Sequence, residues 1–473
     1  MNCSVGGRFL IAAILAFVSL SGCRKPVSET DASPADAPPA SEGAKESASV
    51  PVQPQAFEVG AEELLAARLP ESEASEGWIR LFDGHTLFGW EIAGQANWRV
   101  EDQTIVVDDG DACLLCTSVP WKNYELVLEF NADEGTNSGV FLRTPLDPLD
   151  PALDCYEVNI APVDNPFPTG GVVKRKKASE IQESPGTWQT MRMVLDGRDL
   201  KVSVDGKELC SFEDPLDLPA GRIGLQHNSG KIAFRNIRLR PLGLETLLDA
   251  DLTQWTKYPE MPGEFSVTDE GWLHVQGGRT QLESKQSYGD FVLLAEYKMP
   301  DAAMNSGIFF RCIPGDEMMG YECQLSNEMK DGNPLAPADC GTGGIFRRQD
   351  ARIVAGEAEQ WATVLLVADG PKIASWVNGV QVSDWWDDRE PHENPRKGLR
   401  VEPGTFMIHG HDPGTDAYLK QIQVASAMTS QPRDSEPDTD DKGTSTDSDG
   451  PVTETSDTSA SEQSSDSDTK SGE

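Results

Sequence analysis

A seven-residue stretch occurs twice in the chain and decides its fold. The first copy reads Asn137-Ser138-Gly139-Val140-Phe141-Leu142-Arg143, and the second reads Asn305-Ser306-Gly307-Ile308-Phe309-Phe310-Arg311. Asn-Ser-Gly favours a turn, because glycine adopts positive φ freely and asparagine tolerates it. The β-branched and aromatic residues that follow favour a strand. Each copy therefore predicts a short strand that ends in an arginine.

Further matches follow each copy in the same order. They pair Tyr156-Glu157 with Tyr321-Glu322, Thr169-Gly170-Gly171-Val172 with Thr342-Gly343-Gly344-Ile345, and Trp188 with Trp361. The period is far longer than that of a solenoid repeat. The pattern indicates that a whole domain is duplicated.

Both halves show the alternation of apolar and polar residues that is typical of strands. It is clearest in residues 124–130 and 200–204 of the first half and in residues 291–297 of the second. Asp-Gly turns recur between these runs, and long amphipathic helices are absent from the pattern. The sequence predicts an all-β protein with two tandem β-sandwiches, at residues 77–241 and 243–426.

Charge and composition restrict the partners. The 473 residues carry a formal net charge of −38, which argues against nucleic-acid binding, since that function requires a basic face. Residues 427–473 hold 13 acidic and 3 basic residues and have no core-forming pattern. We expect this segment to be a disordered acidic tail.

The N-terminus has the layout of a targeting segment. Arg8 precedes an apolar run at residues 9–18, which is too short to span a bilayer comfortably. Leu20-Ser21-Gly22-Cys23 resembles the lipobox of bacterial lipoproteins, which implies a signal peptide at residues 1–22 and lipidation of Cys23. An ordinary signal peptide is the alternative. We expect a protein anchored to a membrane of the cell envelope, on the periplasmic or outer-membrane face. Residues 23–76 should form a disordered linker, which a short helix near residues 61–68 interrupts.

The cysteines leave several readings open. Cys113 and Cys116 form a lone C-x-x-C pair, which is a weak metal or redox signal and equally a packing or disulfide pair. Cys312, Cys323 and Cys340 cluster in the second half, where one disulfide would suit an exported protein.

Both halves resemble the 3-keto-disaccharide hydrolase domain, which occurs in exported proteins of Planctomycetes and Bacteroidetes. The markers in the first half are Leu81-Phe82-Asp83-Gly84, Gly89-Trp90, Trp98-Arg99-Val100, the Asn137 stretch, Tyr156-Glu157-Val158, Gly224-Leu225-Gln226-His227 and Phe234-Arg235-Asn236-Ile237. The markers in the second half are Gly320-Tyr321-Glu322-Cys323-Gln324, residues 341–349, Asn394-Pro395-Arg396-Lys397-Gly398 and Gly410-His411-Asp412-Pro413. One departure is His409, which stands where the family usually has glutamine.

The resemblance implies a concanavalin-like jelly roll and a reaction on 3-keto-glycosides. A ketone at carbon 3 acidifies the hydrogen on carbon 2, so a base can form an enolate and expel the glycosidic oxygen from carbon 1. Such a site needs a base, a group that stabilises the enolate and an acid for the leaving group. We expect Glu157 and Glu322 as bases, Arg143 and Arg311 as stabilisers, His227 and His411 as acids or bases, and Asp412 as the partner of His411.

Substrate contacts are expected from polar and aromatic residues near these groups. They are Asn137, Asn305, Gln226, Lys174 and Arg347, with Trp385 and Trp386 in an inserted segment before the last strands as surfaces for a sugar to stack on. The segment His409-Gly410-His411-Asp412 could hold a divalent metal ion, and a loop held by hydrogen bonds explains it equally well.

Each of these residues also has a purely structural interpretation: a glutamate can simply be solvated, and an arginine can simply pair with an acid. Two functional classes follow. At least one domain is a hydrolase or lyase of oxidised sugars, or both are lectin-like modules that hold glycan. In a third arrangement one domain is catalytic and the other binds. The second half carries more of the charged and histidine motifs, so activity is expected there first.

Overall fold

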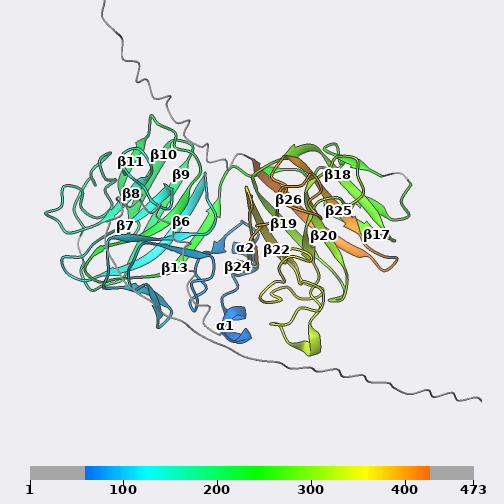
Figure 1. Ribbon diagram of the computed structural model, residues 1–473, viewed down its shortest axis with the longest axis horizontal. Helices are drawn as coiled ribbons and strands as arrows, with labels where there is room; N and C mark the ends of the chain where they lie inside the picture. Colours follow the sequence, from blue (N-terminus) through cyan, green and yellow to red (C-terminus); the bar gives the residue numbers. More distant parts are fainter. Residues whose placement is uncertain (1–58, 183, 259, 427–473) are drawn as a thin grey trace, which may run out of the picture. The chain divides into compact units, whose positions relative to one another are not determined.

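The computed structural model describes residues 59–426, except residues 183 and 259 (Figure 1). Within that part the chain forms 26 strands, the short helices α1 (Ala61–Ala66) and α2 (Glu71–Ala74), and one 3₁₀ turn at Lys330–Gly332. The expected all-β fold with two tandem sandwiches is confirmed. The expected signal peptide, the lipidation site at Cys23 and the acidic tail lie outside the described residues.

The first half contains two antiparallel sheets. The larger has the order β11 (Lys207–Glu213), β10 (Asp199–Val204), β9 (Gln189–Asp196), β6 (Tyr124–Ala132), β13 (Ile232–Pro241), β4 (Thr104–Val107) and β3 (Arg99–Glu101), with β1 (Ile79–Arg80) beside β13. The smaller has the order β2 (Trp90–Ala93), β5 (Cys113–Thr117), β12 (Arg222–Ser229), β7 (Asn137–Thr144) and β8 (Tyr156–Ile160).

The second half repeats this order strand for strand, which confirms the duplication. Its larger sheet runs β24 (Val380–Trp386), β23 (Lys372–Val377), β22 (Ala362–Asp369), β19 (Phe291–Lys298), β26 (Asp416–Ser426), β17 (Leu273–Gln276) and β16 (Glu264–Val267), with β14 (Glu245–Thr246) beside β26. Its smaller sheet runs β15 (Trp255–Lys257), β18 (Thr280–Tyr288), β25 (Gly404–Gly410), β20 (Ser306–Cys312) and β21 (Tyr321–Leu325).

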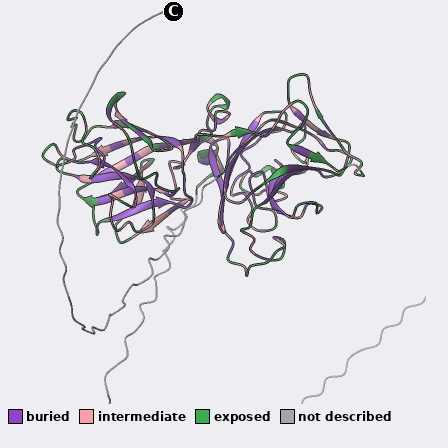
Figure 2. Ribbon diagram, turned by 90° about the horizontal axis from the view of Figure 1, so that it is seen from above, coloured by how far each residue is buried: buried purple, intermediate pink, exposed green. Residues whose placement is uncertain are grey.

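The core of each half lies between its two sheets, as the alternation predicts. On β6, Leu126, Leu128 and Phe130 are buried, whereas Val127 and Glu129 on the other face are partly exposed. Figure 2 shows the same contrast throughout, with buried residues along the strands and exposed residues in the loops. Burial of these apolar faces is the main force that holds the sheets together.

The expected linker ends earlier than residue 76. Residues 61–74 contain α1 and α2, and Leu64 and Ala67 join the hydrophobic core of the second half. The backbone N–H of Leu69 donates to the carbonyl oxygen of Asn378 at 2.9 Å. This segment is ordered because its apolar side chains are buried in a tertiary contact that composition does not reveal.

The two halves also share buried contacts. The indole rings of Trp121 and Trp376 meet edge to face at 5.8 Å, and the Trp376 N–H donates to the carbonyl oxygen of Arg80 at 3.0 Å. Arg352 forms an ion pair with Asp83 at 2.9 Å. Experiments on this protein therefore suit the whole chain better than isolated halves.

The seven cysteines in the described part are all buried and form no disulfide with one another. Cys113 packs in the core between the sheets, and Cys116 belongs to a separate cluster outside it. Burial raises the pKa of the Cys116 thiol to about 12, which disfavours the thiolate that metal binding and redox chemistry require. The packing interpretation of this C-x-x-C pair is the one that fits.

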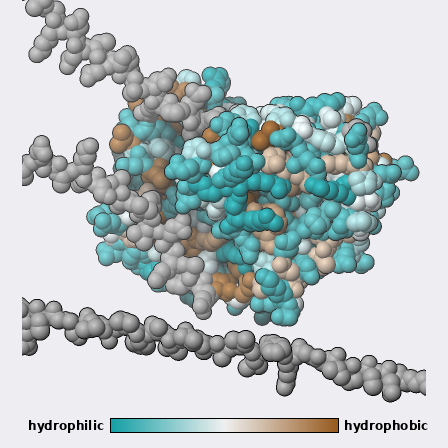
Figure 3. Space-filling view, turned by 45° about the vertical axis from the view of Figure 1, so that its right-hand side comes forward, coloured by the Kyte–Doolittle hydropathy of each residue, from teal (hydrophilic) through white to brown (hydrophobic). Residues whose placement is uncertain are grey.

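Among the described residues, no helix is long and apolar enough to cross a bilayer. The face seen in Figure 3 is mainly hydrophilic, with brown limited to small patches.

The arginine that ends the first repeated stretch is a structural strut. Arg143 is 1 % exposed and has a φ of +50°. Its guanidinium donates to the carbonyl oxygens of Lys122 (2.8 Å), Leu218 (2.8 Å) and Gly197 (2.6 Å), and to Oδ1 of Asn123 (3.2 Å). These partners precede or follow strands of both sheets, so one side chain joins the sheets at this end.

Arg311 repeats the arrangement in the second half. It is fully buried with a φ of +48°, and its guanidinium donates to the carbonyl oxygens of Gly289 (3.0 Å), Gly370 (2.5 Å) and Arg400 (3.2 Å). Asp290 accepts a further bond at 2.8 Å. The expectation that Arg143 and Arg311 stabilise an enolate is wrong for this structure, because both side chains are buried and their guanidinium groups are occupied by the protein's own oxygens.

Replacement of either arginine by methionine should lower stability, since it leaves several buried carbonyl oxygens without a donor. We expect Arg143→Met and Arg311→Met each to cost about 3–5 kcal/mol, measured by urea unfolding of the whole chain. Arg279→Met is the matched control, because Arg279 and its partner Glu317 are exposed, and it should change stability by less than about 1 kcal/mol. Normal stability combined with lost activity would instead favour a catalytic role.

Candidate functional site

A glycine in the middle of the repeated strand makes room for the site. In the second half, Gly307 on β20 lies opposite His409 on β25, and Phe309 lies opposite Glu322 on β21. Alternate residues of a strand share a face, so Gly307, Phe309, Glu322 and His409 all point to the outer face of the five-stranded sheet. A Cβ at position 307 would lie 2.8 Å from Oε1 of Glu322 and 3.2 Å from Nε2 of His409.

Glu322 and His409 meet in the space that Gly307 leaves. Oε1 of Glu322 lies 3.2 Å from Nε2 of His409, and the two residues are 8 % and 3 % exposed. The contact lacks hydrogen-bond geometry, and neither imidazole nitrogen has a hydrogen-bond partner among the described residues. A buried carboxylate beside an imidazole with two unused nitrogens is the arrangement that proton transfer requires.

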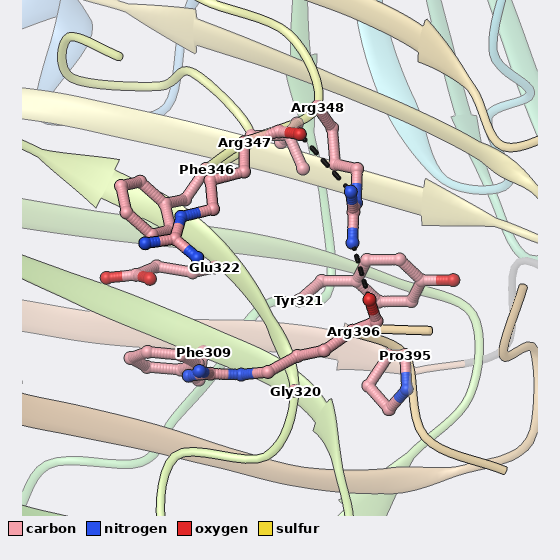
Figure 4. Close-up of a pocket in the computed structure, with 10 residues that line it drawn as sticks. Phe309, Gly320, Tyr321, Glu322, Phe346, Arg347, Arg348, Pro395 and Arg396 are labelled. Atoms are coloured by element: carbon pink, nitrogen blue, oxygen red, sulfur yellow. Dashed lines mark hydrogen bonds between the residues drawn. The ribbon is translucent and has the colours of Figure 1, made fainter. Parts of the chain in front are cut away.

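The carboxylate of Glu322 opens into a small cavity of about 90 Å³ (Figure 4). The side chains of Phe309, Phe346, Arg347, Arg348 and Arg396 form much of its wall. In the close-up, guanidinium groups and aromatic rings surround the glutamate. The cavity therefore combines one carboxylate with three cations and apolar surfaces, a composition suited to a polar ring with a developing negative charge.

The Thr-Gly-Gly turn carries Arg347 to this wall. Ile345 bridges to Cys323 on β21, and the N–H of Phe346 donates to the carbonyl oxygen of Glu322 at 3.0 Å. Arg347 follows with a φ of +59°, the same value as its counterpart Lys174 in the first half. The turn thus places a basic residue beside the glutamate in both copies, Arg347 and Lys174, and their role in binding substrate stays a prediction.

The first half has the same register with different chemistry. Gly139 on β7 lies opposite Gln226 on β12, and Phe141 lies opposite Glu157 on β8, so Gln226 occupies the place of His409. Burial raises the pKa of the Glu157 carboxyl above its usual value, while the Gln226 amide and the charge of Lys174 oppose the shift. Here the carboxylate has an amide partner that does not titrate.

His227 does not reach this site. It neighbours Gln226 on β12 and therefore points to the opposite face, toward the core that contains Leu225. Its side chain is 3 % exposed. The expectation that His227 acts as an acid or base beside Glu157 is wrong for this structure, since a shift of one residue along a strand reverses the face.

His411 and Asp412 lie just beyond the end of β25. Nδ1 of His411 is 3.2 Å from Oδ2 of Asp412, which holds the pKa of the Asp412 carboxyl below its usual range. Both side chains are more than half exposed, and the His411 ring is 6.2 Å from that of His409. This pair borders the site, whereas its role in proton transfer stays a prediction.

The expected metal ligands do not converge. Among the described residues, no group of three or more His, Cys, Asp or Glu side chains is placed to hold a metal ion, and this includes His409, His411 and Asp412.

Of the remaining residues expected to contact substrate, some lie near the site and others do not. Asn305 lies near the site, where its amide donates to Asp339 at 2.8 Å and its oxygen accepts from Gln324 at 3.2 Å. Asn137 is half-buried at the start of β7. Trp385 and Trp386 end β24 instead of lying in the inserted segment.

The two tryptophans differ in environment. Trp385 packs edge to face against Tyr321 at 6.2 Å, which makes it part of the support of the site. Trp386 is 54 % exposed and lines a different, wider hollow. Neither indole lines the cavity at Glu322.

Sequence reasoning missed several parts of this cavity, among them Phe309, Phe346, Arg348 and Arg396. Phe309 stands in the repeated stretch and the other three within family markers, but the loops that carry them to one place meet only in the fold. His409 was considered as a metal ligand, and its contact with Glu322 could have been inferred only from strand register.

The fold and site define a duplicated β-sandwich with a glutamate at the equivalent position of each smaller sheet, and a cavity at the second of these glutamates. The family model for the 3-keto-alpha-glucoside-1,2-lyase-like domain matches residues 77–240 and 243–425. The chain belongs to this family, in two tandem copies.

A curated relative is a 3-keto-disaccharide hydrolase of Bacteroides thetaiotaomicron, 34 % identical over 79 residues. The match covers 14 % of this chain and 27 % of that protein, so the chain spans about a quarter of the length of the relative. Two solved structures from Parabacteroides distasonis, assigned as glycosyl hydrolases, are also similar. They share 21 % and 27 % identity and cover 37 % and 35 % of this chain and 98 % and 99 % of their own, with TM-scores of 0.33 and 0.30.

Alanine at position 307 should separate Glu322 from His409, because its Cβ would occupy the point where they meet. Gly307 lacks a positive φ, so the substitution tests space and not backbone strain. We expect crystal structures of Gly307→Ala to show the two side chains more than 4 Å apart. In the control Gly139→Ala, Glu157 should stay in place, since its nearest atom would be 3.5 Å away. An unchanged pair in Gly307→Ala would contradict the assignment.

Proposed function

We propose that the second sandwich cleaves 3-keto-glycosides and that Glu322 is the base. The observation that supports this most directly is the position of Glu322, which lines a cavity together with guanidinium groups and also contacts the buried imidazole of His409. Family membership supports the class of substrate.

The proposed reaction is an elimination. Glu322 removes the proton from carbon 2, and the electrons of that C–H bond form an enolate with the oxygen on carbon 3. When the ketone re-forms, a double bond arises between carbons 1 and 2, and the bond from carbon 1 to the glycosidic oxygen breaks. Addition of water across the double bond then gives the free 3-keto-sugar, so that the overall result is hydrolysis.

The neighbouring side chains have separate tasks in this scheme. Arg347 is exposed at the cavity and free of an ion pair with any described carboxylate, so its guanidinium can hold the enolate oxygen. His409 stands beside Glu322 and can give a proton to the leaving oxygen. A base and an acid within a few ångströms of each other match adjacent carbons 1 and 2 of one ring.

For the first sandwich we propose a binding role. Gln226 replaces His409, so Glu157 has no titratable partner on its sheet face. The Lys174 ammonium is paired with Asp150 at 2.9 Å. An amide and a carboxylate beside apolar side chains suit hydrogen bonds to sugar hydroxyls, as in a lectin-like module.

Glu322→Gln should slow aglycone release from an aryl 3-keto-α-glucoside by about 10²–10⁴-fold, since an amide cannot accept the proton. Glu157→Gln in the same full-length chain is the matched control and should retain most of the activity. His409→Gln, which gives the second site the pair found in the first, should also slow release. A chelator should leave the rate unchanged. Equal rates for Glu322→Gln and the unchanged protein would refute the base assignment.

We also propose that the protein is a lipoprotein of the cell envelope, anchored through Cys23. The support is the apolar run at residues 9–18 followed by Leu20-Ser21-Gly22-Cys23. Cells that express the chain with a radiolabelled fatty acid should label it, and Cys23→Ser should abolish the label. Labelling that persists in Cys23→Ser would exclude this anchor.

A further inference from the structure

Three guanidinium groups at the cavity of the second sandwich form no ion pair with any carboxylate of the described residues. Most arginines in the described part of the chain pair with a carboxylate, as expected for a net charge of −38. Arg347, Arg348 and Arg396 form no such pair within that part, although all three line one cavity. Unpaired cations that gather in a strongly acidic protein indicate a site for an external anion.

The three side chains are positioned by the protein without being neutralised. Arg348 donates to the carbonyl oxygens of Arg347 (3.2 Å) and Arg396 (2.9 Å), and Arg396 donates to that of Met318 (2.6 Å). Arg347 and Arg396 lie near the rings of Phe346 and Phe309, at 5.1 and 5.9 Å. Carbonyl and ring contacts orient a guanidinium but leave its full charge and part of its donor fork available.

In the first sandwich, the equivalent basic side chains lie beside acidic side chains. Lys174 pairs with Asp150, and Arg175 lies 3.3 Å from Asp214. Arg396 has no counterpart there, since only residues 214–221 connect β11 to β12, whereas residues 387–403 connect β24 to β25. The surplus positive charge is therefore particular to the second copy.

The reaction of a neutral 3-keto-glucoside does not require three unpaired guanidinium groups. Its enolate carries one negative charge on one oxygen, and one guanidinium can stabilise it. Glu322 offers one further anion, which leaves more positive charge than the proposed reaction uses. The cavity volume of about 90 Å³ is small for a whole disaccharide but sufficient for a planar or tetrahedral anionic group.

We infer that the substrate of the second sandwich is an acidic sugar, whose carboxylate or sulfate group is held by Arg348 and Arg396 while Arg347 faces the reacting ring. This inference rests on the proposed function for the location of the sugar. Guanidinium forks bind carboxylate and sulfate oxygens in a bidentate manner, which gives both affinity and orientation. The first sandwich, with its cations paired, should bind neutral sugar.

The inference can be tested by binding alone, without any reaction. Calorimetric titration of the full chain with glucuronic acid, glucose 6-sulfate and glucose compares the two anionic groups with a neutral ring. We expect at least one acidic sugar to bind about tenfold more tightly than glucose, and the preference to weaken as salt is added. The better of the two acidic sugars identifies whether the group is a carboxylate or a sulfate.

Single substitutions test which side chains cause the preference for acidic sugars. Arg396→Gln and Arg348→Gln should each remove most of the preference, and Lys174→Gln, the matched change in the first sandwich, should leave it intact. Thermal unfolding of each variant verifies that the chain is folded. Equal binding of acidic and neutral sugars, a preference that survives in both arginine variants, or equally tight binding of inorganic sulfate would each overturn the inference.

The outcome is independent of the catalytic assignment. Glu322→Gln should keep the preference for acidic sugar, because the carboxylate is not part of the anion site. If activity proves absent while the preference remains, the reaction is wrong and the acidic-sugar site stands. If Glu322 is shown to be the base while the preference is missing, only the acidic-sugar inference fails.

Discussion

The buried guanidinium at the end of each repeated strand is the interaction on which the rest of the structure depends. Arg311 and Arg143 collect carbonyl oxygens from loops of both sheets, so each fixes the distance between the sheets at one end of its sandwich. Such a group is expensive to bury, and its cost is offset only when several oxygens surround it. The strand that carries it is thereby held in one register, and that register decides which side chains face the site.

The second constraint is the glycine within each repeated stretch, Gly139 or Gly307, which leaves space on the sheet face. Gly307 lets Glu322 and His409 approach within 3.2 Å on a sheet face that would otherwise keep them apart. The same gap at Gly139 receives Glu157 and Gln226. Both copies thus have the space and the carboxylate, while the partner of the carboxylate is an amide in the first copy and an imidazole in the second.

The two copies differ most in whether the basic side chains of the site form ion pairs. Loop acids pair with the cations of the first site, whereas the longer connection between β24 and β25 adds Arg396 to the second, where it forms no ion pair with a described carboxylate. Changes in loops alter a site at little cost in stability, because the sheets that position it stay the same. This explains how one scaffold can carry both a binding site and a reactive site in a single chain.

The sequence by itself determined the duplication and the all-β class, because alternation along a strand and recurrence along the chain can both be read from the order of residues alone. It also placed Glu322 and Arg347 among the site residues. Only the tertiary structure decided that Arg143 and Arg311 are struts, since the carbonyl oxygens that surround them come from remote loops. It also showed that His227 faces the core and that His409 is the residue that meets Glu322. The physical reason is that the face of a residue depends on strand register, and register is set by contacts between segments that lie far apart in the chain.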